Sequence, residues 1–116
     1  MVALVLLVTL IGGATMASVG LLGLLGRLSP NSLAGIRTAY TRASDENWYA
    51  VHRFGGPLLL FGGIPVVSVS LALLPFAAAG KVPDAVTLGA GAGGAAVLAI
   101  SAVAAWWYGT AMAKAR

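Results

Sequence analysis

The chain has 116 residues, of which 59% are hydrophobic and only 9% are charged, and its mean hydropathy is +0.95. A soluble domain of this size has too much surface for its volume to bury so many apolar side chains, so the composition predicts an integral membrane protein. The net charge of +4 does not indicate a nucleic-acid partner, because the basic residues flank apolar segments, and the absence of cysteine excludes disulfides and cysteine-based metal sites.

The first apolar segment covers residues 2–25 and contains no charged side chain. At about 1.5 Å per residue it is long enough to cross a hydrocarbon core of about 30 Å. A cleaved signal peptide is the alternative. However, no Lys or Arg precedes the run, and the run exceeds the usual apolar region of roughly 7–15 residues. We therefore expect a retained transmembrane helix.

A polar loop over residues 26–54 follows this segment and contains the only histidine, His52. Ser44 is a favourable N-cap, and the two acidic residues after it place negative charge in the first turn of a helix. The residues that follow at helical spacing on one apolar face are Trp48, Val51, His52 and Gly55. We expect a short amphipathic helix at the membrane interface that leads directly into the second span.

Two further uncharged segments predict spans over about residues 55–79 and 85–109, joined by a tight hairpin at residues 80–84. Pro57 would occupy the first turn of a restarting helix, and Pro65 would kink the second span. The expected fold is an all-α single transmembrane domain over residues 1–116. It has three transmembrane helices and a cytoplasmic loop that carries the short interfacial helix.

The basic residues predict the orientation of these spans. Four arginines lie in the first loop and two basic residues lie in the C-terminal tail, whereas the hairpin has only Lys81, offset by Asp84. The positive-inside rule then places the loop and the C-terminus in the cytoplasm and the N-terminus outside. We expect a multi-pass protein of the bacterial inner membrane.

The third predicted span contains small residues at helical spacing. Gly89 and Gly93 form a GxxxG pair, and Ala92 and Ala96 repeat the spacing. Such faces let helix backbones approach closely. We expect this face to pack against the first span, and an interface with a second copy or a partner is the alternative. No ionisable residue lies within the core of any span, which disfavours a transport function.

The polar loop also contains a longer series of residues: Asn31, Gly35-Ile36-Arg37-Thr38, Thr41, Ser44, Trp48, His52-Arg53 and Gly55-Gly56. In order and spacing this series resembles the signature of the SdpI/YfhL family of bacterial membrane proteins. The resemblance covers essentially the whole chain but only the C-terminal module of the longer founding members. It implies immunity to a secreted, membrane-active peptide toxin and recruitment of a transcriptional repressor to the membrane.

Within this series, two arginines are candidate anion-binding residues. Arg37 and Arg42, with Thr38, Thr41 and the start of the Ser44 helix, could form a cradle for a phosphate or carboxylate group. The alternative is that Arg37 caps carbonyl groups of its own loop or pairs with the neighbouring acidic residues.

Other residues of the series have simpler interpretations. Trp48 is expected to anchor the helix at the membrane interface. His52 is either a pH-sensitive group or a hydrogen-bonded structural residue. Asn31 is expected to close the turn before Gly35 through its side chain. We also assign Arg53 to the candidate ligand- or partner-binding surface.

No nucleophile–base pair, paired carboxylate site or phosphate-binding loop emerges from the sequence, so we expect no enzymatic activity and no cofactor. The leading hypothesis is an immunity or signalling factor that binds a partner or an anionic ligand through the loop. The alternatives are a structural subunit of a larger membrane complex and a lipid-binding protein. The expected partners are membrane lipids, a peptide toxin or repressor protein, and a larger complex or a second copy, without nucleic acid.

Overall fold

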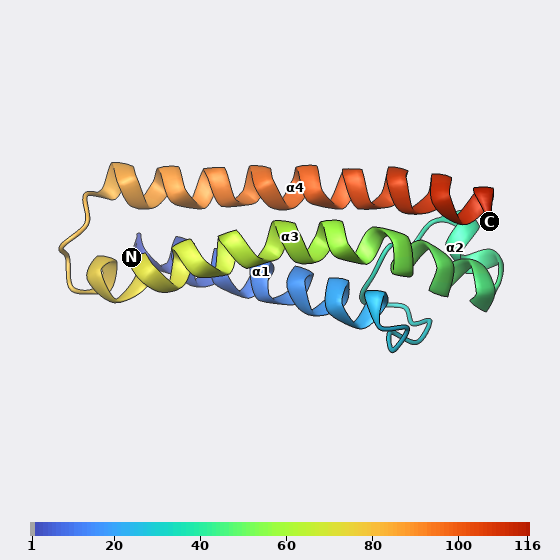
Figure 1. Cartoon of the computed structure of the whole chain (residues 1–116). Coiled ribbons are helices and arrows are strands. Elements are labelled where there is room, and N and C mark those ends of the chain that lie inside the picture. Colours follow the sequence, from blue (N-terminus) through green and yellow to red (C-terminus); the bar gives the residue numbers. More distant parts are fainter. Residues whose placement is uncertain (1) are drawn as a thin grey trace.

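A computed structural model describes residues 2–116 and shows an all-helical protein over that range. Its helices are α1 (Ala3–Leu24), α2 (Ala39–Ala43), α3 (Asp45–Ala78) and α4 (Asp84–Ala115). The three long helices lie side by side, and α2 lies with the connecting loop at the end of the bundle where α4 finishes (Figure 1). Within the described range, these three helices are long and apolar enough to cross a membrane, as the sequence predicts.

The long helices differ in length, and this difference positions the loop. The 22 residues of α1 span about 33 Å, whereas the 34 residues of α3 span about 51 Å, well beyond a hydrocarbon core of about 30 Å. Gly23, near the end of α1, lies level with His52. The first turns of α3 therefore extend past α1 at the polar end of the bundle, where the loop covers them.

The beginning of α3 differs from the sequence prediction. The segment that starts at Ser44 forms a helix as expected, but this helix is not separate from the second span, because α3 continues through Pro57 and Pro65 and ends at Ala78. Pro57 removes one helical hydrogen bond, to the carbonyl of Arg53. That carbonyl lies near the polar end of the bundle, where an unpaired acceptor costs less than it would at the centre of a membrane.

Backbone contact between α1 and α3 is made by two pairs of glycines. A Cβ atom on Gly20 would lie 2.6 Å from the carbonyl oxygen of Gly56, and one on Gly63 would lie 2.6 Å from that of Gly13. The glycines are seven residues apart on each helix, so they recur on the same face of an antiparallel pair. Because side chains are absent there, the two backbones approach more closely than larger residues would allow.

The neighbouring glycines of α3 turn toward α4. A Cβ atom on Gly55 would lie 2.7 Å from the carbonyl oxygen of Ala105, and one on Gly109 would lie 2.7 Å from that of Val51. Ala105 and Ala113 are fully buried in the same interface. The helix-packing repeat of α4 is therefore the four-residue series Ser101, Ala105, Gly109 and Ala113, which the sequence also contains.

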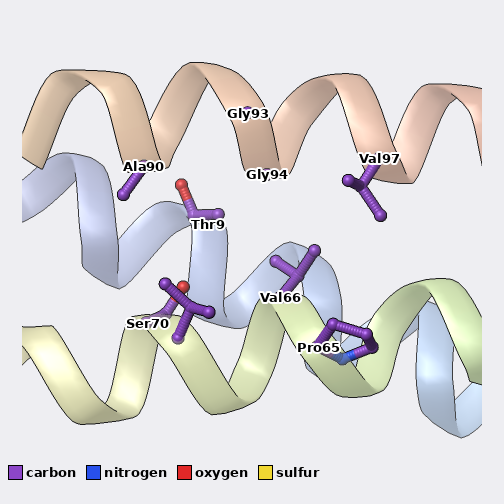
Figure 2. A pocket seen from close by; sticks show the side chains of 9 residues that line it. Thr9, Pro65, Val66, Ser70, Ala90, Gly93, Gly94 and Val97 are labelled. Carbon is purple, nitrogen blue, oxygen red and sulfur yellow. The ribbon is translucent and has the colours of Figure 1, made fainter.

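The expected packing of Gly89 and Gly93 against α1 is not observed, whereas the alternative interface with a second copy or a partner stays a prediction. A Cβ atom on either residue would meet no other atom within 4 Å, and both residues are exposed. The glycines of α4 that approach α1 are Gly91, beside Val5, and Gly94, beside Thr9. Gly93 instead lines an apolar pocket of about 270 Å³ between α1, α3 and α4 (Figure 2). Neither glycine of the GxxxG pair is therefore in close contact with another helix of the described range.

Candidate functional site

The candidate site is the polar loop and the part of α3 that it covers. Trp48 and His52 lie one turn apart on α3, each is only 1% exposed, and their ring centroids are 4.2 Å apart. The Trp48 indole Nε1–H donates a hydrogen bond of 2.9 Å to the carbonyl oxygen of Leu28. Trp48 is thus buried inside the protein, and the expected anchor at the membrane interface is wrong for this residue.

His52 connects the loop to α3 through both ring nitrogens. Its Nε2 accepts a hydrogen bond of 2.8 Å from the backbone N–H of Ile36, and its Nδ1 lies 2.7 Å from the carbonyl oxygen of Trp48. Because a carbonyl oxygen can only accept, Nδ1 carries the proton and the ring is neutral. Of the two interpretations of His52, this geometry favours the hydrogen-bonded structural residue.

The turn before Ile36 brings the loop onto these two rings. The Oδ1 of Asn31 accepts hydrogen bonds from the N–H groups of Leu33 and Ala34, at 2.8 Å and 2.7 Å, which confirms that this side chain closes the turn. Gly35 has a φ of +113°, a region that other residues rarely adopt. A Cβ atom there would lie 2.7 Å from Nε2 of His52, so Gly35 is required both for the turn and for the contact.

The hydroxyl groups of the signature hold the short helix α2 against the loop. Thr38 is the N-cap of α2, and its Oγ1 accepts from the N–H of Thr41 at 3.2 Å. The Oγ1 of Thr41, a residue only 1% exposed, donates to the carbonyl oxygen of Ile36 at 2.8 Å and accepts from the N–H of Thr38 at 2.8 Å. Ser44 caps α3 as predicted, because its Oγ accepts from the N–H of Asn47 at 3.1 Å.

These hydrogen bonds leave fewer groups for the anion-binding cradle that the sequence predicts. The hydroxyl groups that were to complete it are engaged with the loop backbone, so only the arginines remain available. Arg37, Arg42 and Arg53 are exposed, and none of them forms an ion pair with another residue of the described range. Glu46 pairs instead with Arg116, at 3.3 Å, so the alternative pairing of Arg37 with this carboxylate is not observed.

Sequence reasoning assigned no role to several residues that complete the site. Ile36 is 9% exposed and is the residue through which the loop contacts both His52 and α3. The Nδ2 of Asn47 donates to the carbonyl oxygen of Tyr40 at 3.0 Å, and Lys114 Nζ lies 5.1 Å from the centre of the Tyr40 ring. The signal that could have indicated such contacts is the presence of large apolar side chains in a polar loop, of which Leu28 and Ile36 are buried and Leu33 is exposed.

Charge is distributed unequally between the two ends of the bundle. The loop end carries six basic residues and two acidic ones, a net charge of +4, whereas the hairpin carries Lys81 and Asp84, a net charge of zero. The six basic residues are Arg27, Arg37, Arg42, Arg53, Lys114 and Arg116. The whole net charge of the protein is therefore concentrated around the docked loop.

Comparison with known proteins identifies the family of this chain. A search of curated proteins found no match, and a search of solved structures found none either. The family model described as the SdpI/YfhL protein family matches residues 27–113, which include the loop, α2, α3 and nearly all of α4. The match extends over three quarters of the sequence, and the chain therefore belongs to the SdpI/YfhL protein family.

Proposed function

We propose that this membrane protein is an immunity or signalling factor that acts by binding rather than by catalysis. Its binding surface is the platform formed by Arg37, Arg42 and Arg53 on the docked loop and the start of α3. The observation that carries the proposal is that the polar groups of the signature have two different environments. The hydroxyl, amide, indole and imidazole groups hold the backbone, while the arginines are exposed.

This arrangement suits a binding function better than a chemical one. A reactive hydroxyl or imidazole needs a free atom directed at a substrate. Here Thr41 and His52 each use their polar atoms within the protein, and both side chains are buried. Exposed guanidinium groups on a rigid backbone can contact an anionic partner without first becoming ordered. The partner class we propose is a peptide toxin or a signalling protein with carboxylate groups.

The orientation that we propose places the platform in the cytoplasm of a bacterium and the hairpin outside. It is supported by the net charge of +4 at the loop end against zero at the hairpin. The chain has no cysteine, so single cysteines introduced at Ser32 and Lys81 can be labelled without background. We expect an impermeant thiol reagent added to intact cells to label the Lys81→Cys protein only. Labelling of the Ser32→Cys protein alone would show that the orientation is the opposite of the proposed one.

A challenge with a membrane-active peptide toxin tests the function. A sensitive host that expresses the protein should survive better than the same host without it. The triple variant Arg37→Ala, Arg42→Ala, Arg53→Ala should lose this protection. Each cation near an anionic partner contributes about 1 kcal/mol, so loss of three weakens binding on the order of 100-fold. The matched control is Lys81→Ala, which removes an exposed cation from the opposite end.

Two outcomes would contradict this proposal. One is equal killing with and without the protein when its amount in the membrane is normal. The other is full protection by the triple alanine variant. Stoichiometric co-purification with a membrane enzyme would instead favour the accessory-subunit hypothesis, for which the unpacked face at Gly89 and Gly93 offers a surface.

A further inference from the structure

A second feature of the bundle is an apolar groove between α1 and α4. Both helices pack along α3, but they separate below the docked loop and leave a space of about 340 Å³. Its walls are Thr15, Met16 and Val19 of α1 and Ala102 of α4, and its floor is Leu59 of α3. The backbone at Gly35 and Ile36 forms the end of the groove nearest the loop.

The groove is bounded at both ends along the bundle. At the end away from the loop, α1 and α4 meet, because a Cβ atom on Gly12 would lie 3.3 Å from the side chain of Leu98. At the loop end, the side chain of Ile36 packs onto α3 beside Gly55. The wall residue Thr15 is exposed, and its hydroxyl donates to the carbonyl oxygen of Ile11, so it offers no free polar group.

The position of the groove along the membrane normal determines which kind of molecule can occupy it. Its α1 residues lie between the middle of that helix and the end nearest the loop, at the depth of the hydrocarbon core. Water is excluded there, and the lining is almost entirely apolar. A hydrocarbon chain that enters from the side therefore fits the groove, whereas a charged or strongly hydrated ligand does not.

A cation follows directly at the loop end of the groove. Ile36 lines the groove and packs onto α3, and Arg37 is the next residue along the chain. Arg37 is exposed and has no ion-pair partner in the described range. An apolar groove that ends next to an unpaired guanidinium matches a molecule with a hydrocarbon chain and an anionic head.

We propose that this groove binds one acyl chain of an anionic phospholipid, and that Arg37 contacts the phosphate group of the same molecule. The pocket of Figure 2 lacks this combination, because none of its lining residues is next to a basic residue in the sequence, whereas Ile36 in the groove directly precedes Arg37. The proposal goes beyond the toxin- or partner-binding function. It shares Arg37 with the platform but needs neither toxin nor partner protein, and Arg42 and Arg53 have no role in it.

Native mass spectrometry of the purified full chain tests this site. The detergent micelles are supplied with phosphatidylglycerol or, separately, with phosphatidylcholine of the same acyl chains. We expect one retained phosphatidylglycerol per chain and little phosphatidylcholine. Ala102→Leu, which fills the groove, should lower retention roughly fivefold, and Arg37→Ala should do the same. Arg37→Lys should keep part of the retention, because it preserves the charge.

Matched controls separate the groove from general effects on the bundle. Ala99→Leu adds the same side chain to a part of α4 outside this groove, and Lys81→Ala removes an exposed cation from the opposite end of the bundle. Both should retain lipid like the wild type. If Ala102→Leu lowers the unfolding temperature, Thr15→Leu fills the groove from α1, with Ser18→Leu as its control.

Equal retention by the groove-filling variants and their controls would overturn the proposal, as would equal retention of the two lipids. A loss caused by Arg37→Ala without a loss caused by filling the groove would also overturn it, since the head group would then bind without the acyl chain. These measurements use no toxin. Their failure leaves protection by the arginine platform intact, and failure of protection leaves lipid retention intact.

Discussion

Alanine at Gly56 should prevent α1 and α3 from packing, whereas alanine at Gly93 should leave the bundle intact. A Cβ atom on Gly56 would lie 2.5 Å from the carbonyl oxygen of Gly20 and 2.8 Å from the backbone nitrogen of Leu24. Both atoms belong to a helix backbone and cannot rotate away, so the helices must separate. We expect a loss at or above the upper end of the roughly 1–3 kcal/mol typical of overpacking.

The measurement is unfolding of each variant in mixed micelles with increasing denaturing detergent, followed by circular dichroism. Gly20→Ala should behave like Gly56→Ala, because its Cβ atom would lie 2.6 Å from the carbonyl oxygen of Gly56. The control Gly93→Ala should be neutral or should stabilise the helix by about 0.4–1 kcal/mol, since nothing lies within 4 Å of the added atom. Equal stability of Gly56→Ala and Gly93→Ala would refute this packing scheme.

Replacement of His52 by alanine should release the loop from α3. The change removes the acceptor of the Ile36 N–H and leaves a space beneath Gly35 and Trp48. An unpaired buried donor costs about 1–3 kcal/mol, and the cavity adds to this. Hydrogen exchange at the Ile36 amide measures the release directly. We expect much faster exchange in His52→Ala, partial protection in His52→Gln, and no change in the matched control Arg53→Ala, which alters the exposed neighbour.

The same contact should make loop docking sensitive to acid. The groups that face the ring are Gly23, Gly35, Ile36 and Trp48, and none of them has a titratable side chain. A second proton on the ring would replace the acceptor of the Ile36 N–H with a donor, so only the neutral ring fits the docked loop. In the released loop the ring has the ordinary pKa of about 6.5, so docking is strongest above this pH and weakens as the pH falls below it.

Unfolding temperatures at pH 7.5 and pH 5 provide the check. The wild-type protein should lose more stability between these values than His52→Gln, whose side chain does not titrate. An equal loss in the two proteins would assign the acid sensitivity to other groups. The exposed acidic residues at this end, Asp45 and Glu46, are unchanged in both proteins, so their contribution cancels in the comparison.

Features that depend on neighbouring residues were predictable from the sequence. The long uncharged runs predicted three spans because a charged side chain is costly within a bilayer. Ser44 and Asn31 were assigned correctly because each side chain bonds to a backbone group two or three residues away. The division of the signature between buried and exposed groups was not predictable in this way. Ile36 and His52 are sixteen residues apart and meet only when the loop folds over α3.

The side of each helix that packs against its neighbours was likewise not predictable from a local sequence pattern. The sequence of α4 contains two series of small residues, one at Gly89 and Gly93 and one at Ala105 and Gly109, and both satisfy the same spacing rule. Only the second series contacts α3. The reason lies in α3, where Gly56 and Gly63 face α1, whereas Gly55 and Gly62 face α4. Which series packs depends on the partner helix as much as on α4 itself.

The sequence by itself determined that this chain is a membrane protein of the SdpI/YfhL family with three segments long and apolar enough to cross a membrane, since charge, apolar length and motif spacing are all readable along the chain. The tertiary structure decided which polar residues hold the loop and which remain exposed. It also decided where the helices touch and where they leave the groove beneath Ile36. The physical reason is that a group becomes buried or hydrogen-bonded only when two surfaces meet, and these surfaces meet only after α1, α3 and the loop have come together.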